Sequence, residues 1–327
     1  MEKNHKEILL NVSILVIVLS LMSLAFELSL RYSHAKGRKK ILDKQSENQL
    51  CTTYADDPRL IYTYIPGKCG ANRMGYQDDE HDYEGSQGVY RIIVIGDSVA
   101  EGEGLSQNRF DRNETFPNIM EERLNKQGLK TEVIVLARSG YSTGQQLILL
   151  KEEALRYDPD LIIWSYVLND PAHPVYHNAN GEFGIYFHRP ASYILDTVQA
   201  AFFHIREMIR ERDCPWEYHA MLHCVYRDQV ESDIREIGEI AGREDITVLF
   251  AINPIFQAKP TFKEYTLSGV HEELAGTASK AGLIPVDMLS SFADEVPAET
   301  HVSLWHPNRK GHRIIANRLV KEISDLT

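Results

Sequence analysis

Ser98 and His306 are residues whose types suit covalent catalysis. A serine hydroxyl is a weak nucleophile and needs a neighbouring base to take its proton as it attacks a carbonyl carbon. An imidazole can be that base, so the pair could cleave or transfer an acyl group through an acyl-enzyme. The non-catalytic alternatives are that Ser98 is an ordinary turn serine after Asp97 and that His306 is a structural histidine.

The elements that must position these residues follow from hydrophobic periodicity. Residues 90–95 form a short apolar run ended by Gly96, as expected for a central strand buried on both faces. Strand-like runs are predicted at residues 90–95, 132–136, 161–165, 247–252 and 283–286. Helical patterns are predicted at residues 115–127, 143–157, 191–212, 227–243, 262–281 and 307–323. This alternation predicts parallel strands joined by helical crossovers, with ligands at the carboxyl ends of the strands.

Residues capable of chemistry follow the predicted strands at four places. The blocks are Gly96-Asp97-Ser98, Ser139-Gly140-Tyr141, Leu168-Asn169-Asp170 and Trp305-His306-Pro307-Asn308. In this order they resemble the blocks of the SGNH (GDSL-type) hydrolase superfamily over about residues 91–327. The resemblance implies a three-layer α/β/α sandwich with a central parallel sheet, which is a flavodoxin-like fold.

The resemblance also implies a site. Ser98 would be the nucleophile and His306 the general base. The oxyanion would be bound by the backbone N–H groups of Ser98 and Gly140 and by the side-chain amide of Asn169. As alternatives, Gly140 and Asn169 could simply be turn residues. No metal or organic cofactor is required.

One position departs from the family pattern. Family members usually carry an aspartate three residues before the histidine, and this sequence has Ser303 there. Three explanations remain open: a dyad supported by the Ser303 hydroxyl or a backbone carbonyl, a displaced acid, or a degenerate enzyme. The candidate acids are Asp294, Glu295 and Glu299.

The N-terminal segment, residues 1–30, is predicted to be a transmembrane helix. Residues 8–26 are apolar except for one Asn and three Ser, and about 19 helical residues cover about 28 Å, close to the thickness of a hydrocarbon core. A cleavable signal peptide is the alternative, but its apolar region is usually shorter and followed closely by small residues. An uncleaved signal-anchor is therefore favoured.

Two signals for membrane orientation disagree. Five basic residues between 31 and 40 follow the span and two precede it, so the positive-inside rule favours a cytoplasmic domain. The cysteines fall in two close pairs that could form disulfides in an oxidising compartment, namely Cys51 with Cys69 and Cys214 with Cys224. Free thiols are the alternative. We expect a single-pass protein with its catalytic domain outside the cytoplasm.

Beyond the span, residues 31–88 are predicted to form a juxtamembrane linker and an irregular extension, and residues 89–327 the hydrolase domain. Residues 171–215 form a long insertion after the Asn169 block. The aromatic residues in and after it are expected to shape the substrate pocket or pack over the site: Tyr176, Tyr186, Phe187, Tyr193 and Trp216.

Composition limits the partners. The 327 residues are 43% hydrophobic and carry a formal net charge of −12, which argues against binding to nucleic acid. The expected activity is hydrolysis of O-acyl esters, including O-acetyl, on small molecules or on cell-envelope or exported glycans. The alternatives are a catalytically impaired glycan-binding or assembly protein, a lipid esterase and an acyltransferase. Nothing in the sequence sets the oligomeric state.

Overall fold

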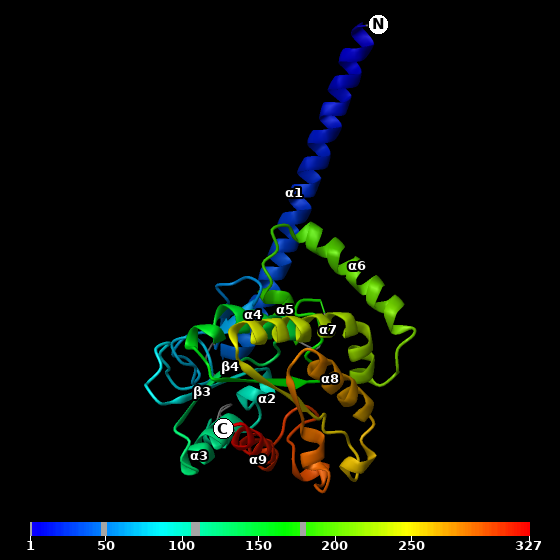
Figure 1. Cartoon of the computed structure of the whole chain (residues 1–327). Helices are drawn as coiled ribbons and strands as arrows, with labels where there is room; N and C mark the ends of the chain where they lie inside the picture. Colours follow the sequence, from blue (N-terminus) through cyan, green and yellow to red (C-terminus); the bar gives the residue numbers. More distant parts are fainter. Residues whose placement is uncertain (1, 47–50, 106–111, 177–180) are drawn as a thin grey trace.

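The computed structural model describes residues 2–46, 51–105, 112–176 and 181–327. Within these residues, five strands form one parallel sheet in the order β4-β3-β5-β6-β7 (Figure 1). The strands are β3 Tyr90–Gly96, β4 Thr131–Ala137, β5 Leu161–Val167, β6 Thr247–Asn253 and β7 Ile284–Asp287. This is the flavodoxin-like order, so the predicted fold class is confirmed.

Helices cover both faces of the sheet. Helices α3 and α9 lie on one face and α4 and α7 on the other (Figure 1), while α8 packs against α7 and β7. The helices described in this domain are α2 Ser98–Glu101, α3 Phe116–Lys126, α4 Thr143–Glu152, α5 Gly181–Phe187, α6 Tyr193–Glu211, α7 Tyr218–Glu244, α8 Ser268–Lys280 and α9 Arg309–Leu326. Short 3-10 turns occur at Arg112–Glu114, Ala154–Tyr157, Phe262–Glu264, Met288–Phe292 and Pro297–Glu299.

The two helical layers explain the continuous apolar runs of the central strands. Ile92, Ile93 and Val94 alternate between the two faces of β3, and none of them is exposed to solvent. Every residue of β5 is likewise buried. Branched side chains suit such strands, because they pack well on a pleated surface that is covered on both sides.

Helix α7 begins nine residues before the predicted start at residue 227. Leu222 and Val225, one helical turn apart, are buried in this first part of the helix. The Glu217 side chain caps the helix by accepting a hydrogen bond from the N–H of Ala220 at 2.8 Å. Polar and histidine residues between these positions hide the helical periodicity in the sequence.

The longest helix, α1 Glu2–Ser46, contains the predicted membrane span and continues well past it (Figure 1). By length and composition it could cross a membrane, a test that a signal sequence also passes. Residues 31–46, in the predicted linker, are therefore helical. This stretch lacks proline, and Ile41 is buried, so tertiary contacts support the helix. Residues 47–49 of the predicted linker lie outside the described residues.

The extension from residue 51 to residue 88 is largely irregular, as predicted. It contains a small antiparallel pair of strands, β1 Thr52–Tyr54 and β2 Tyr62–Tyr64. A disulfide between Cys51 and Cys69 closes this segment. The Tyr62 hydroxyl donates a hydrogen bond to the carbonyl oxygen of Ser139 at 2.6 Å, which ties the extension to the end of β4.

Candidate active site

Ser98 is the first residue of α2 and follows β3 directly. Asp97 caps this short helix, since its Oδ1 accepts a hydrogen bond from the N–H of Val99 at 2.9 Å. A Cβ atom on Gly96 would lie 2.9 Å from the carbonyl oxygen of Ser165 on β5. Glycine therefore allows the chain to turn against the neighbouring strand and to place Ser98 at the carboxyl end of the sheet.

His306 lies next to Ser98, although 208 residues separate them in sequence. Its Nε2 is 2.9 Å from Ser98 Oγ, within hydrogen-bond distance. The loop that carries His306 is closed by the N–H of Val302, which donates to the His306 carbonyl at 2.9 Å. Helix α9 then begins at Arg309, two residues later than predicted, because the Asn308 side chain caps it.

The Ser98 hydroxyl proton has two acceptors within reach. Asp97 Oδ2 lies 3.1 Å from Ser98 Oγ, slightly farther than His306 Nε2. Burial raises the pKa of the Asp97 carboxyl, so this carboxyl holds its proton more strongly than an exposed aspartate does. Donation to His306 is the arrangement that suits attack by the serine.

The third position of the site is occupied by Ser303. Its Oγ lies 2.9 Å from Nδ1 of His306. The same oxygen accepts hydrogen bonds from the N–H groups of Trp305 at 3.3 Å and His306 at 3.2 Å. A hydroxyl thus stands on the side of the imidazole where family members carry a carboxylate.

The structure does not bring the three candidate acids to His306. Glu295 and Glu299 both pair with Lys310, whose Nζ lies 2.6 Å and 3.1 Å from their carboxylate oxygens. Asp294 is exposed on the surface. The sequence order of these residues suggested proximity, but the ion pairs hold both glutamates at Lys310, at the start of α9.

Gly140 lies in the turn after β4. Its φ of +79° is in the left-handed region that favours glycine. The turn is closed by the N–H of Tyr141, which donates to the carbonyl of Arg138 at 3.0 Å. Among the described residues, the N–H of Gly140 has no hydrogen-bond acceptor, so it is available to a bound group.

Asn169 lies in the turn after β5. Asp170 holds this turn, since its Oδ2 accepts from the N–H of Val167 at 3.0 Å and its carbonyl accepts from Thr143 at 3.0 Å. Burial, together with the charge of Asp97, places the pKa of Asp170 well above its usual range. The Oδ1 of Asn169 is buried and lacks a partner among the described residues. Rotation of the Asn169 amide exchanges the positions of its oxygen and nitrogen atoms. The NH₂ group can therefore occupy the position of the unpartnered oxygen.

Two glutamates that the sequence analysis did not single out join the Ser98 and Gly140 turns. Glu101 Oε2 accepts from the N–H of Ser139 at 2.8 Å, and Glu103 accepts from the Ser139 hydroxyl. Glu103 Oε2 also lies 3.8 Å from His306 Nε2. Burial raises the pKa of Glu101 to about 8. These contacts fix the turns that carry two proposed oxyanion donors relative to each other. The positions of the two glutamates after Ser98 match no motif, so the sequence alone does not indicate this role.

The aromatic residues of the insertion lie away from the catalytic pair. Tyr193 and Tyr186 contact His34 of α1, and Phe187 packs against Tyr54. Tyr176 packs on His173 and Phe203, and Trp216 is fully exposed. Tyr186 and Tyr193 thus help to secure α1 to the domain, and the expected role of the insertion in shaping the substrate pocket stays a prediction.

The four cysteines form two disulfides, Cys51–Cys69 and Cys214–Cys224. The second joins the segment after α6 Tyr193–Glu211 to helix α7. Within the described ranges, no cluster of three or more His, Cys, Asp or Glu side chains is arranged to hold a metal ion.

A family model described as the GDSL-like lipase/acylhydrolase family matches residues 94–314. This range contains all four blocks that carry chemistry. No curated protein matches the sequence.

Solved structures with a similar fold include two acetylxylan esterases. That from Geobacillus stearothermophilus is 15% identical, with a TM-score of 0.46, and the match covers 73% of this chain and 96% of that one. The acetyl xylan esterase AlAXEase is 14% identical, with a TM-score of 0.47 and coverage of 71% and 99%. An alpha/beta hydrolase from the metagenome of Lake Arreo, Spain, is 15% identical, with a TM-score of 0.46 and coverage of 75% and 99%.

Proposed function

Because the chain belongs to the GDSL-like lipase/acylhydrolase family and is thus an ester hydrolase, we propose that Ser98 is its nucleophile and His306 its general base. The observation that carries this proposal is the 2.9 Å contact between Ser98 Oγ and His306 Nε2. In the first step His306 takes the hydroxyl proton as Ser98 attacks the ester carbonyl. The alcohol leaves with that proton, and an acyl-serine remains.

In the second step His306 takes a proton from water as the water attacks the acyl-serine. The bond between the acyl group and Ser98 Oγ breaks, the acid leaves, and His306 returns the proton to Ser98 Oγ. The oxyanion formed in both steps is stabilised by the N–H groups of Ser98 and Gly140 and by the Asn169 amide. The Gly140 N–H, which has no acceptor among the described residues, supports this assignment.

Ser303 takes the place of the third triad member in this proposal. For His306 to accept a proton at Nε2, its own proton must reside on Nδ1. Ser303 Oγ can accept that Nδ1–H at 2.9 Å and so select the productive tautomer. The site is then a serine-histidine dyad oriented by a hydroxyl.

The proposed substrate is an O-acyl ester, including O-acetyl, on a cell-envelope or exported glycan. Helix α1 supports this proposal, since a membrane anchor would hold the enzyme beside such polymers. Trp305, next to His306, is partly exposed, and its indole N–H donates to His219 Nε2 at 3.1 Å. A fixed, exposed indole face suits a sugar ring.

The catalytic domain is proposed to lie outside the cytoplasm. The two disulfides support this side, because such bonds persist in oxidising compartments. The basic residues after the span favour a cytoplasmic domain. We give the disulfides more weight, because cysteine oxidation depends on the compartment in which the folded domain itself lies. Mass spectrometry of the protein from its native membrane, with and without reduction, tests the assignment: free thiols at all four cysteines contradict export.

The catalytic proposal is tested with the full chain in detergent and a chromogenic acetate ester. Ser98→Ala and His306→Ala should each lower turnover by about 10³-fold or more. Ser279→Ala and His204→Ala, at exposed positions, are matched controls and should retain activity. Wild-type turnover no faster than that of Ser98→Ala, across several acyl lengths, would overturn the proposal. Comparing acyl groups on envelope glycans with and without the gene tests the substrate class.

A further inference from the structure

Helix α6 Tyr193–Glu211 carries an apolar stripe that faces outward. Six large apolar side chains form it, each between 46% and 70% exposed: Leu195, Val198, Phe202, Ile205, Met208 and Ile209. Their spacing of mostly three and four residues places them on one side of the helix. Within α6 only Phe203 and Glu207 are buried, and they lie on the opposite side.

The inward side of α6 accounts for its attachment to the domain. Phe203 packs against Tyr176 and His173, and Glu207 accepts a hydrogen bond from the Tyr226 hydroxyl of α7. These contacts leave the outward stripe uncovered by the described chain. Soluble monomers rarely expose a contiguous apolar area of this kind, so such a stripe indicates a partner or a membrane.

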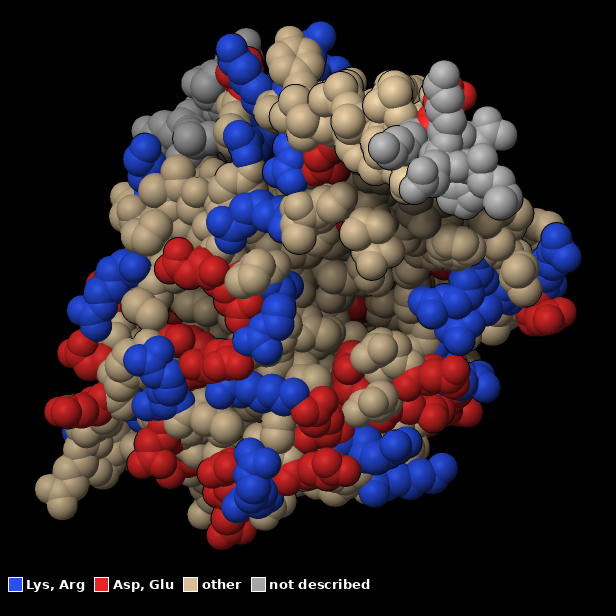
Figure 2. All heavy atoms as spheres, turned by 90° about the horizontal axis from the view of Figure 1, so that it is seen from above, with Lys and Arg blue, Asp and Glu red and all other residues tan. Residues whose placement is uncertain are grey.

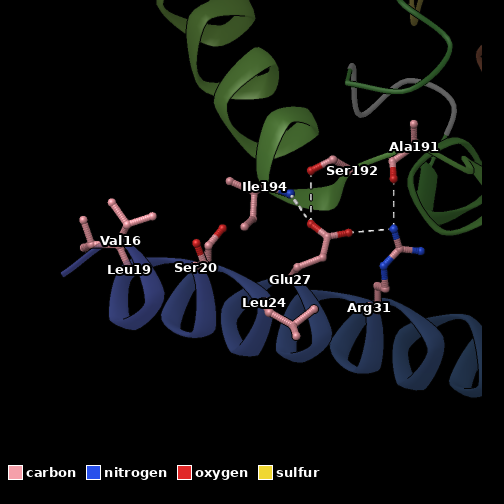
Figure 3. Close-up of a pocket in the computed structure, with 10 residues that line it drawn as sticks. Val16, Leu19, Ser20, Leu24, Glu27, Arg31, Ala191, Ser192 and Ile194 are labelled. Atoms are coloured by element: carbon pink, nitrogen blue, oxygen red, sulfur yellow. Dashed lines mark hydrogen bonds and ion pairs between the residues drawn. The ribbon is translucent and has the colours of Figure 1, made fainter. Parts of the chain in front are cut away.

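The start of α6 is held against α1 at the end of the apolar span. The Glu27 carboxylate accepts hydrogen bonds from the N–H of Ile194 at 3.0 Å and from the Ser192 hydroxyl at 3.1 Å (Figure 3). It also accepts one from the N–H of Tyr193 at 3.1 Å. Arg31 pairs with Glu27 at 2.7 Å and donates to the carbonyl of Ala191 at 2.9 Å (Figure 3).

Glu27 immediately follows residues 8–26, the part of α1 that is long and apolar enough to cross a bilayer. In a bilayer spanned by residues 8–26, these contacts would hold the first turn of α6 at the boundary between lipid tails and headgroups. From there α6 runs outward from α1 on the side of the domain nearest the N-terminus (Figure 1). An apolar groove between the two helices, lined by Leu19, Leu24 and Ile194, joins the surface of the span to α6.

The charges around the stripe suit lipid phosphates. Exposed cations occur on both helices: Lys36, Lys39 and Lys40 on α1, beyond Glu27, and Arg206 on α6. Arg31 is paired with Glu27, and Arg210 donates a hydrogen bond to the carbonyl of Val225. Seen from above, the face contains an uncharged area bordered by Lys and Arg side chains and also by Asp and Glu side chains (Figure 2). Apolar side chains beside a rim of cations are typical of helices that lie in the plane of a membrane interface.

We propose that α6 is an interfacial helix that lies on the bilayer beside α1, with its apolar stripe inserted at the boundary of headgroups and acyl chains. This rests on the anchoring part of the proposed function. The two helices together hold the domain in a defined orientation, with α3 and α9 on the side away from the membrane (Figure 1). The disulfide Cys214–Cys224 secures the far end of α6 to α7.

The test uses the full chain in vesicles of phosphatidylcholine and phosphatidylglycerol. Because all four native cysteines are in disulfides, single cysteines can carry an environment-sensitive fluorophore. Phe202→Cys probes the stripe, Val16→Cys probes the span, and Ser279→Cys on α8 is the exposed control. Lipids with a nitroxide near the headgroup should quench the Phe202 probe several-fold more than the Ser279 probe. Lipids with a nitroxide deep in the tail should quench the Val16 probe.

If the Val16 probe is quenched but the Phe202 probe is quenched no more than the Ser279 probe, the proposal of an interfacial helix is overturned. The proposal that α1 is a membrane anchor is then unaffected. Absence of quenching at both positions overturns the anchor as well. If the Phe202 signal depends on protein density and nitroxide lipids have no effect on it, the stripe binds a second copy of the protein. This result also overturns the proposal. Phe202→Glu with Ile209→Glu, both at exposed positions, should abolish headgroup quenching of a Leu195→Cys probe and leave the Val16 probe unchanged.

Discussion

Ser303 Oγ lies 2.9 Å from Nδ1 of His306, on the side of the imidazole opposite its contact with Ser98. A carboxylate at this position can only accept, and so holds the proton on Nδ1. A hydroxyl can accept or donate, so it selects the productive tautomer less strictly and adds no negative charge to stabilise the imidazolium. In the proposed mechanism, a neutral residue thus stands where electrostatic support for the general base is usually placed.

Replacement of Ser303 tests this relationship. Ser303→Ala should lower kcat by about 5-fold, the loss of one hydrogen bond worth about 1 kcal/mol. Ser303→Asp should raise kcat, and the acidic limb of the pH profile should move to higher pH because the carboxylate stabilises the charged imidazole. Steady-state kinetics across pH measures both effects. Ser303→Asn, similar in size but neutral, is the control; equal behaviour of the Asp and Asn variants would contradict the electrostatic account.

Asn169 is expected to act mainly in the transition state. Asn169→Ala should lower kcat about 10²- to 10³-fold with KM little changed, since one oxyanion donor is worth about 3 to 4 kcal/mol. Asn169→Asp should not restore activity, because a carboxylate cannot donate to an oxyanion. Kinetics with a small chromogenic ester measures the effect, and Asn317→Ala, on the exposed face of α9, should match wild type. A change confined to KM would argue for ground-state binding.

Glu101 should make the protein less stable as pH rises. Burial raises its pKa from 4.5 to about 8, so between these values the folded form keeps a proton that the unfolded chain has lost. The free energy of unfolding then falls as pH increases through this window. Glu101→Gln keeps an acceptor for the Ser139 N–H and removes the ionisation.

Urea unfolding from pH 5 to pH 8 measures this difference. The stability of Glu101→Gln relative to wild type should increase steadily across the range. Glu272→Gln, at an exposed position on α8, is the control and should show a constant difference. A constant difference for Glu101→Gln as well would mean that this carboxyl is already ionised in the folded protein at pH 5.

His312 should have the opposite pH dependence. Burial, and the charge of His306 to a smaller degree, lower its pKa from 6.5 to about 3, while Nδ1 accepts from the N–H of Phe116 at 3.1 Å. As pH falls below 6.5, the unfolded chain binds a proton that the folded chain excludes, so stability decreases toward acid. His312→Asn can supply an acceptor without titrating.

Thermal unfolding between pH 4 and pH 7 measures the contribution of His312. The melting temperature of His312→Asn should fall less steeply with acid than that of wild type. His204→Asn on the exposed side of α6 should follow wild type. Parallel curves for His312→Asn and wild type would show that His312 does not resist protonation in the folded state.

Much of the fold could be predicted from the sequence because its signals are local. A continuous apolar run such as residues 90–95 specifies a strand buried on both faces, and alternation with helical patterns specifies a parallel sheet. The order of the four blocks likewise assigned Ser98, Gly140, Asn169 and His306 to strand ends. The start of α7 and the helical residues 31–46 were missed, because their helicity depends on packing partners that the local pattern does not contain.

The sequence by itself therefore determined the fold class, the family and the residues available for chemistry. Only the tertiary structure decided which groups meet. It places Ser303 and not Glu295 or Glu299 against His306, because Lys310 holds both glutamates. It also joins Glu101 to the Gly140 turn and docks α6 on α1. Contacts between segments far apart in the chain depend on how complete elements pack, and no local pattern encodes that packing.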